Sequence, residues 1–258
     1  MSDGKLAINY AGGTDRGKVR AQNEDSILMS GFEHSDVVLL VVADGVGGHK
    51  GGEVASKLSV DSLHEFVGKS VLQAHSGGGY GSDWLELTLS HAVFETNARL
   101  IKHQQENIDL NNMASTVVAM LFHNNEFVIS YLGDSRCYQF HDDKLLQLTE
   151  DHTMLQNLLN EGKINQQEFE AMPMHHMISQ ALGLSPEPDV QVSRLVYDSE
   201  TSFLFCSDGL TNCVSDAQIQ QVLSKNEELE NAVDELITKA NDNGGIDNIS
   251  VILVKTVS

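Results

Sequence analysis

The sequence predicts an α+β fold in which antiparallel sheets pack together and helices cover them. Two long amphipathic patterns follow the first strands, and a series of short strands at hairpin spacing comes next. Helical patterns then alternate with further short strands up to the end of the chain. The number of predicted strands suits two sheets.

Helical segments are expected from the spacing of apolar residues and from capping residues. The second helix begins at Asp83, where an acidic residue follows three positions later, and Asn165 and Ser215 open capping boxes of the same kind. Between the first two helices, the Gly- and Ser-rich stretch 76–82 is interpreted as a flexible connection. The expected helices are 52–68, 83–106, 153–161, 165–171, 215–224 and 227–242.

Strands are expected where short apolar or β-branched runs lie between turn residues. The strongest is the apolar run that begins at Val37 and leads directly into Asp44. The predicted strands are 7–11, 26–30, 37–43, 116–122, 127–132, 136–140, 190–195, 202–206 and 249–254.

Composition is that of an ordinary globular protein, with 41% hydrophobic and 21% charged residues. No run of about 18 apolar residues is present, so no membrane-spanning helix is expected. The first residues lack the basic and apolar regions of a signal peptide. The three cysteines form no Cys-x-x-Cys pair, which argues against a disulfide framework or a thiolate zinc site. The protein is therefore expected in the cytoplasm, with no membrane partner.

The net charge of −21 argues against nucleic acid as a partner, because nucleic-acid binding requires a basic face. An acidic excess of this size is explained either by a soluble acidic surface or by carboxylates that cluster to hold divalent cations. Composition alone does not decide between the two.

Aspartates stand at the ends of four predicted strands, each beside a glycine or an asparagine; they are Asp44, Asp134, Asp208 and Asp247. Any one of them alone is most simply a turn residue. If the four strand ends converge, the like charges repel one another, and protonation or bound cations must relieve the repulsion. Oxygen ligands without His or Cys favour Mg²⁺ or Mn²⁺, and Gly45 lets a backbone carbonyl or a bridging water approach an ion.

Arg20, with Glu24 and Asp25 shortly after it, adds a cation to this acidic set. By itself the segment is typical of a surface salt-bridge network. Beside a pair of metal ions, however, an arginine fork suits the paired oxygens of a phosphate. The combination predicts metal-assisted hydrolysis of a phosphate ester, in which the ions lower the pKa of a bridging water and Arg20 holds the phosphoryl group.

Five motifs, in order along the chain, resemble the metal-dependent serine/threonine protein phosphatases, the PPM or type 2C family, and most of all its compact bacterial members. Each motif alone is weak, but the five in this order are specific, and the resemblance extends from about residue 7 to residue 255. The motifs are Arg20-x-x-Asn-Glu-Asp25, Asp44-Gly-Val-Gly-Gly48-His-x-x-Gly-Glu53-x-Ala-Ser56, Gly133-Asp-Ser-Arg136, Ser207-Asp-Gly-Leu210 and Asp247-Asn-Ile-Ser250.

The resemblance implies a four-layer α-β-β-α sandwich with two central antiparallel β-sheets and a binuclear Mn²⁺ or Mg²⁺ site at one end. It also implies that residues 1–258 form a single phosphatase domain with a variable flap at about 151–180. The flap is expected to hold two short helices and then Met172-Pro-Met-His-His-Met177, and to be either a plain surface segment or one that contacts the substrate.

Carried over to this chain, the family pattern assigns roles to the strand-end residues. Asp44 would bridge the two metal ions, and the carbonyl of Gly45 would bind one of them. Asp208 and Asp247 would bind the other ion.

The pattern also assigns roles to the remaining charged residues. Glu24 or Asp25 would complete the acidic shell directly or through water. Asp134 would join Asp208 at a third ion of the kind seen in bacterial relatives, and Arg20 would bind the substrate phosphate.

The implied activity is hydrolysis of phosphoserine and phosphothreonine in proteins, with the metal-bridging water as the attacking group and no phospho-enzyme. The implied partners are phosphorylated proteins, including a bacterial Ser/Thr kinase, and the chain is expected to be a monomer. A catalytically silent phosphoprotein-binding regulator on the same fold is the alternative, and a small-molecule phosphatase is a third interpretation. The complete carboxylate set favours the active enzyme, because a binding module does not need every metal position.

Three positions depart from the family pattern. Val46 stands where many eukaryotic relatives carry a histidine proposed as general acid, so the leaving group must be protonated from elsewhere, for example by a metal-bound water; His49 is interpreted as a turn residue. The stretch Met113-Ala-Ser-Thr116 replaces Gly-Thr-Thr after a methionine, which is expected to be a structural change. Gln180 replaces an arginine, which removes a cation near the flap.

Overall fold

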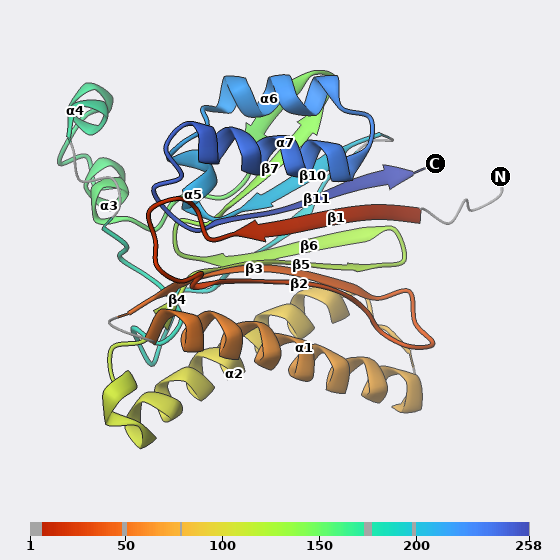
Figure 1. Cartoon of the computed structure of the whole chain (residues 1–258). Helices are drawn as coiled ribbons and strands as arrows, with labels where there is room; N and C mark the ends of the chain where they lie inside the picture. Colours follow the sequence, from red (N-terminus) through yellow and green to blue (C-terminus); the bar gives the residue numbers. More distant parts are fainter. Residues whose placement is uncertain (1–6, 48–50, 78, 173–176, 198–199, 258) are drawn as a thin grey trace.

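The computed structural model describes residues 7–47, 51–77, 79–172, 177–197 and 200–257, and they form four stacked layers (Figure 1). Two β-sheets lie face to face in the centre, and every strand pairing in them is antiparallel. A pair of helices covers the outer face of each sheet. This arrangement confirms the predicted α-β-β-α sandwich.

One sheet has five strands and the other has six. The five-stranded sheet contains, in spatial order, β1 (Ala7–Asp15), β11 (Ile249–Val257), β10 (Ser202–Cys206), β7 (Arg136–His141) and β8 (Lys144–Gln147). The six-stranded sheet contains β2 (Asp25–Gly31), β3 (Val38–Val46), β5 (Val117–His123), β6 (Glu126–Leu132) and β9 (Gln191–Leu195), with β4 (Ala114–Ser115) paired to the end of β3.

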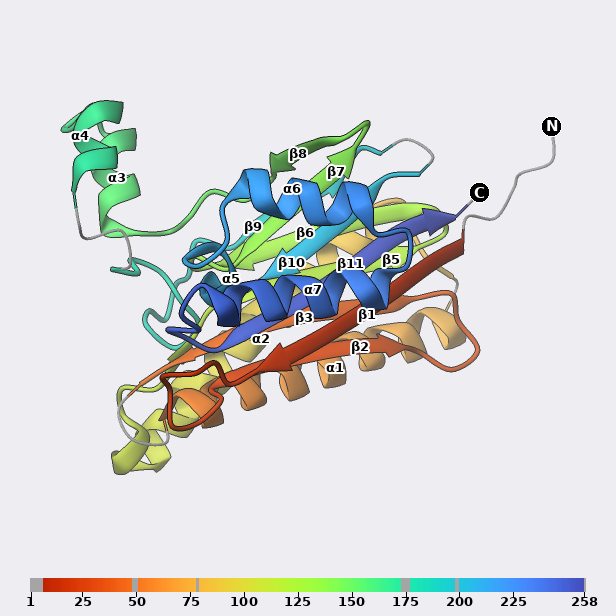
Figure 2. The ribbon, with the colours of Figure 1, turned by 45° about the horizontal axis from the view of Figure 1, so that its top comes forward.

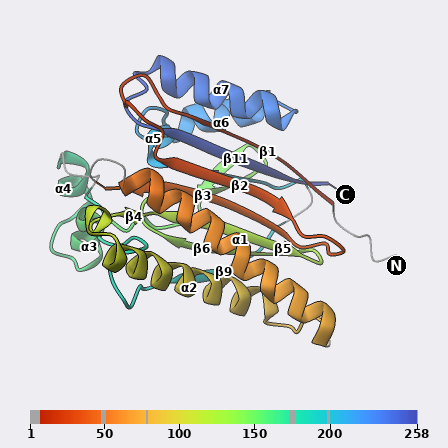
Figure 3. The ribbon, with the colours of Figure 1, turned by 60° about the horizontal axis from the view of Figure 1, so that its bottom comes forward.

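Helices cover the two outer faces and form the flap. Figure 2 shows α6 (Asp216–Lys225) and α7 (Leu229–Asp242) over the five-stranded sheet, with the short α5 (Asp208–Thr211) before them. Figure 3 shows α1 (Gly51–Gly77) and α2 (Trp84–Glu106) side by side on the six-stranded sheet; the 3₁₀ helix η1 (Ile108–Leu110) follows them. The predicted flap contains α3 (Met154–Asn160) and α4 (Gln166–Ala171), which stand apart from the sandwich (Figures 1 and 2).

Apolar side chains form a buried layer between each pair of adjacent structural layers. The central layer lies between the two sheets and is built from large residues such as Leu40, Phe127 and Phe203, all of which are fully buried. Burial of this apolar surface is the main stabilising contribution to the stack. The polar residues of the predicted site lie outside it, at strand ends, at the start of α5 and in loops at one end of the sandwich.

Several elements extend further than predicted, and tertiary contacts explain the extension of three of them. The first helix continues to Gly77 rather than ending near residue 68, since Val71 and Ala74 prolong its buried face. The first strand continues to Asp15 because it pairs residue by residue with β11. The strand that was expected to end before Asp44 continues to Val46, where β4 pairs with it.

The predicted helix caps were right at two helices and wrong at one. The side chains of Asn165 and Glu168 form the expected reciprocal capping box, and the N–H of Ser215 donates to the side chain of Gln218. Asp83, however, makes no side-chain capping hydrogen bond. Its ψ of 15° departs from the extended backbone that a capping residue needs.

Two hairpins depend on asparagine and aspartate pairs with positive φ. Asn124 and Asn125 join β5 to β6, and Asp142 and Asp143 join β7 to β8, each pair with φ between 49° and 65°. Two successive residues of this conformation make a type I′ turn, whose twist matches that of antiparallel strands. The strand β8 was not predicted, because its four residues carry no strong apolar pattern.

No helix among the described residues is long and apolar enough to span a membrane. The expectation that residues 1–258 form a single domain stays a prediction. Of the Met/His run that ends the flap, residues 173–176 lie outside the described part of the chain.

Replacing Leu40 by alanine should lower the free energy of unfolding by about 2–5 kcal/mol, because it leaves a cavity between the two sheets. The control is Leu72→Ala, which truncates the same side chain at a position on α1 that is 70% exposed, and should change stability by less than about 0.5 kcal/mol. Urea unfolding at a fixed metal concentration measures both. Equal effects of the two substitutions would contradict the placement of Leu40 in the central layer.

Candidate active site

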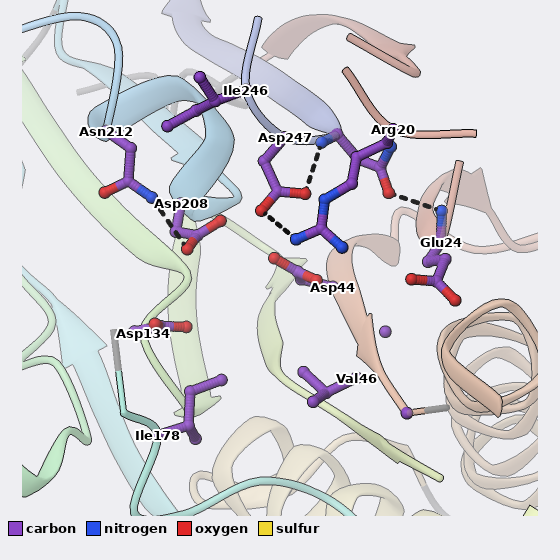
Figure 4. Close-up of a pocket in the computed structure, with 13 residues that line it drawn as sticks. Arg20, Glu24, Asp44, Val46, Asp134, Ile178, Asp208, Asn212, Ile246 and Asp247 are labelled. Atoms are coloured by element: carbon purple, nitrogen blue, oxygen red, sulfur yellow. Dashed lines mark hydrogen bonds and ion pairs between the residues drawn. The ribbon is translucent and has the colours of Figure 1, made fainter. Parts of the chain in front are cut away.

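A cavity of about 450 Å³ opens at the end of the sandwich where the predicted site residues meet (Figure 4). Its walls come from six separate parts of the chain: the β1–β2 loop, the end of β3, the β6–β7 turn, the segment between α4 and β9, the start of α5 and the loop before β11. The predicted site residues that line it are Arg20, Glu24, Asp44, Gly45, Asp134, Asp208 and Asp247. Residues as far apart in sequence as 20 and 247 are therefore brought together, as predicted.

Asp44 is fixed in place by its own backbone. Its N–H donates to the hydroxyl of Thr116 at 3.0 Å, and the N–H of Thr116 donates back to the Asp44 carbonyl at 2.8 Å. The Thr116 hydroxyl also lies 2.7 Å from that of Ser135, next to Asp134. In the stretch that departs from the family pattern, the hydroxyl of Ser115 also donates to the Asp44 carbonyl at 3.2 Å, which is the structural role expected for it.

Gly45 is required by close packing of the backbone. A side-chain carbon at this position would lie 2.0 Å from the carbonyl oxygen of Gly52 and 2.6 Å from that of Glu24. The N–H of Gly45 also donates to the Glu24 carbonyl at 3.1 Å. The first turn of α1 and the start of β2 can approach Asp44 this closely only because residue 45 has no side chain.

The other aspartates of the cavity come from turns and from a helix start. Asp208 is the first residue of α5, and its Oδ2 accepts from the side chain of Asn212 at 3.0 Å. Asp134 lies in the β6–β7 turn and is 6% exposed. Its Oδ1 accepts no hydrogen bond from the residues that the structure describes.

Arg20 lies in the β1–β2 loop and forms an ion pair inside the cavity. Its Nη2 donates to Oδ2 of Asp247 at 2.6 Å (Figure 4). This hydrogen bond raises the pKa of Arg20 above its usual value. Burial lowers the pKa, but by less than the hydrogen bond raises it. The predicted phosphate-binding cation is thus in the site, and in this structure its partner is a predicted metal ligand.

Asn248 joins the two loops that carry Arg20 and Asp247, and the sequence analysis did not single it out. Its side-chain amide donates to the carbonyls of Arg16 and Gln22 at 2.8 and 2.9 Å, and its side-chain oxygen accepts from the N–H of Glu24 at 2.8 Å. The sequence did contain a signal for this role, because an asparagine stands directly beside the strand-end Asp247. An asparagine side chain can donate and accept hydrogen bonds at the same time.

Asp25 is absent from the described lining of the cavity. It is the direct cross-strand partner of Asp44 in the β2–β3 pairing and is 7% exposed. Its Oδ2 accepts from the hydroxyl of Ser207 at 2.7 Å. Of the two acidic residues that the sequence left as alternatives, Glu24 is the one that faces the cavity.

Comparisons with known proteins agree with this geometry. The sequence pattern of the family described as protein phosphatase 2C matches residues 13–253. The chain belongs to the protein phosphatase 2C family.

Individual relatives of the 2C family cover nearly the whole chain. The chain is 35% identical to the serine/threonine phosphatase stp of Listeria innocua, over 94% of this chain and 93% of that protein. It resembles the crystal structure of the Mycobacterium tuberculosis serine/threonine phosphatase PstP/Ppp with a TM-score of 0.81 and 34% identity, over 97% and 98% of the two chains. A structure of the PstP catalytic domain in complex with two manganese ions matches with a TM-score of 0.79 and 35% identity, over 98% and 100%.

Electrostatic repulsion is strong among the carboxylates of this 2C-family cavity. Burial raises the pKa of Asp44 well above its usual range, and the charges of Asp25, Asp208 and Asp134 raise it further. The pKa of Asp134 is raised to about 7, mainly by burial and to a smaller extent by the charge of Asp208. Burial also raises the pKa of Asp25 to about 7, although hydrogen bonds from two serines lower it. Without a cation, Asp25 and Asp134 are therefore partly protonated near pH 7.

The donor set fits the divalent ions implied for the 2C family. The ionisable side chains that line the described cavity, apart from Arg20, are carboxylates, and one buried oxygen of Asp134 accepts no hydrogen bond from described residues. Hard ions such as Mg²⁺ and Mn²⁺ prefer such oxygen ligands. No group of three Asp, Glu, His or Cys side chains among the described residues is arranged tightly enough to hold an ion by itself. Backbone carbonyls and waters must therefore complete the ligand shell. Mg²⁺ commonly keeps several of its waters when it binds to a protein.

Aliphatic side chains also line the cavity, and the sequence analysis placed only one of them there. Val46 is 42% exposed and stands at the rim, as its position after Asp44 implied. Ile178 and Ile246 line other parts of the wall (Figure 4). No histidine contributes to the wall among the described residues, and His49 lies outside them.

Metal-free protein should lose stability as the pH rises from about 5.5 to 7.5. The carboxyls of Asp25 and Asp134 titrate near 7 when folded but near 3.8 when unfolded, so the folded state binds more protons between these values. Their contribution to stability is therefore full below pH 3.8 and is lost as the pH rises through about 7. Thermal unfolding in EDTA at several pH values measures this.

The matched control for the pH profile is Asp134→Asn, which removes one of the two groups. Its unfolding temperature should fall less between pH 5.5 and 7.5 than that of the wild type. An equal or steeper fall in the variant would show that Asp134 is not protonated in the metal-free site.

Proposed function

We propose that this chain is a metal-dependent protein serine/threonine phosphatase that hydrolyses phosphoserine and phosphothreonine. The observation that carries the proposal is the convergence of Asp44, Asp134, Asp208 and Asp247 with Arg20 in one cavity. A carboxylate set of this kind holds divalent cations, and the guanidinium supplies the one described cation of the wall that can bind a phosphate.

In this proposal each acidic residue contributes to holding Mn²⁺ or Mg²⁺. Asp44 would help to hold both ions, the Gly45 carbonyl would bind one of them, and Asp208 and Asp247 would bind the other. When bound, the ions supply a water of lowered pKa and neutralise the charge of the phosphoryl oxygens.

The outer residues of the site complete the proposed cation shell. Glu24 faces the cavity and completes the shell directly or through water, whereas Asp25 acts by its charge and by its position opposite Asp44. Asp134 and Asp208 offer a place for a third ion, and the buried oxygen of Asp134 that accepts no hydrogen bond from described residues supports this.

The chain's own residues would bind and orient the substrate phosphate. The Arg20 guanidinium, whose Nη2 contacts Asp247 in this structure, would donate to the phosphoryl oxygens of the substrate. The bond from phosphorus to the serine or threonine oxygen breaks as a bond to the water oxygen forms, and inorganic phosphate leaves. Because no described histidine lines the wall, the proton for the leaving oxygen comes from a water in the cavity.

We also propose that the chain acts as a monomer in the cytoplasm on phosphorylated proteins, including a Ser/Thr kinase. Two features support a reducing compartment and a protein substrate. All three cysteines are free thiols, and two of them are buried. The relatives from Listeria innocua and Mycobacterium tuberculosis, which match nearly the whole chain, are named as serine/threonine phosphatases. A catalytically silent phosphoprotein-binding regulator remains the alternative, and turnover decides between the two.

Purified protein should hydrolyse phosphothreonine peptides and p-nitrophenyl phosphate when Mn²⁺ or Mg²⁺ is present, and EDTA should stop the reaction. Asp208→Asn should lower kcat by at least about 100-fold, because it removes a charged ligand from the proposed ion. Circular dichroism checks that the variant is folded. A metal-loaded wild type without turnover on either substrate would favour the silent regulator.

Arg20→Ala should raise KM for phosphopeptides by about 10-fold or more, since it removes charge-assisted hydrogen bonds to the phosphate. The matched control is Arg16→Ala, which removes a guanidinium from the same loop at an exposed position outside the cavity lining. Steady-state kinetics at saturating Mn²⁺ measure both variants. If the two variants have the same KM, Arg20 does not bind the phosphate.

A further inference from the structure

The two ends of the flap pair with each other at its base. We call residues 151–154 and 177–179 the flap feet. The N–H of Met154 donates to the carbonyl of Met177 at 2.8 Å, and that of Ser179 donates to the carbonyl of His152 at 2.8 Å. Thr153 and Ile178 form an antiparallel bridge between these contacts. The feet are therefore one short ladder, and Ile178 within it lines the catalytic cavity.

The first foot is bonded to the residue just before Asp134. The N–H of His152 donates to the carbonyl of Gly133 at 2.9 Å, and the N–H of Gly133 donates to Nδ1 of His152 at 3.2 Å. Burial lowers the pKa of His152, and the hydrogen bond from Gly133 uses Nδ1 of the ring as its acceptor. Gly133 has a φ of +118° and lies against Thr116, so this turn has little room to move.

The same foot is bonded to the strand that follows Asp134. Nε of Arg136 donates to both oxygens of Asp151 at 2.9 and 3.1 Å, and Nη2 donates to Oδ2 at 2.6 Å. Both side chains are mostly buried, with 26% and 19% of their surface exposed. Nη1 of Arg136 also donates to the hydroxyl of Tyr138 at 2.9 Å. The guanidinium is thus held in one orientation by a fork of hydrogen bonds.

Asp134 is therefore held from both sides by consecutive residues of one flap foot. Gly133 is bound by His152, and Arg136 is bound by Asp151. We propose that Arg136 and Asp151 are a positioning pair that sets the place of the Asp134 carboxylate relative to the flap wall at Ile178. The proposal rests on the proposed function, in which Asp134 holds a divalent ion.

Loss of a positioning pair and loss of an ordinary stabilising ion pair would change different measured properties. A merely structural pair lowers the unfolding temperature and leaves the folded site as it was. A positioning pair also alters ion binding and turnover per folded molecule, because Asp134 and the flap feet move relative to each other. Partners that orient metal ligands typically contribute about 10- to 100-fold in affinity or activity.

Hydrogen–deuterium exchange tests the pair without any need for catalysis. In Asp151→Asn, the amides of His152, Met154 and Ser179 should exchange at least about 10-fold faster, because the base of the flap opens locally. The amides of α6 and α7 should exchange as in the wild type. The control is Lys163→Gln, which breaks the exposed Lys163–Glu161 ion pair of the same flap and should leave the feet unchanged.

Ion binding and kinetics test the consequence for Asp134. Calorimetry should show Mn²⁺ affinity lowered by about 10-fold or more in Asp151→Asn and in Arg136→Lys, because lysine keeps the charge but loses the planar fork. The double variant should be little worse than either single one, since both remove the same contact. kcat should fall in parallel with the affinity.

Two outcomes overturn the positioning role. One is faster unfolding of the variants with wild-type Mn²⁺ affinity and kcat per folded molecule, which would make the pair merely structural. The other is unchanged exchange at the feet in Asp151→Asn. If the wild type itself shows no turnover, the proposed function fails, while exchange and Mn²⁺ calorimetry still decide whether Arg136 and Asp151 position Asp134.

Discussion

Mutual repulsion among buried carboxylates is the constraint on which the rest of the site depends. Asp25 and Asp44 face each other across β2 and β3, and burial together with neighbouring charges raises the pKa of both. Such an arrangement is unfavourable without protons or cations, so rigid surroundings have to maintain it. The hydrogen bonds of Thr116 and the close contact at Gly45 supply that rigidity. The apolar layers of the sandwich supply the stability that the charged end lacks.

The site also depends on bringing the two ends of the chain together. β1 pairs with β11 over its whole length, which places the loop after β1 beside the loop before β11. Asn248 then bonds this first loop at three points, across more than 220 residues of sequence. The feet of the flap are fixed in a similar way to the turn that carries Asp134. Most charged residues of the cavity are thus held by contacts remote in sequence, whereas Asp208 is bonded to Asn212 only four residues away.

Features that depend on local sequence could be predicted, whereas features that depend on contacts between distant parts of the chain could not. The strand-end aspartates and Gly45 were recognisable because each stands close to the end of an apolar run, and the run before Asp44 leads directly into it. Ile178 and Asn248 were not, because their roles arise only when the flap returns and the two loops meet. The length of β1 was underestimated for the same reason, since pairing with β11 overrides its two central glycines. The Asp83 cap failed because the local backbone is not extended there.

The ion pair between Arg20 and Asp247 has a consequence for the order in which ligands bind. In this structure the guanidinium serves as an internal counter-ion for a carboxylate that is proposed to hold a metal. A cation at Asp247 competes with Arg20 for the same oxygen and so frees the arginine for an anion. By thermodynamic reciprocity, an anion that takes up Arg20 exposes Asp247 and favours the cation. Metal and phosphate would therefore bind with positive cooperativity, through one shared side chain rather than through a change of fold.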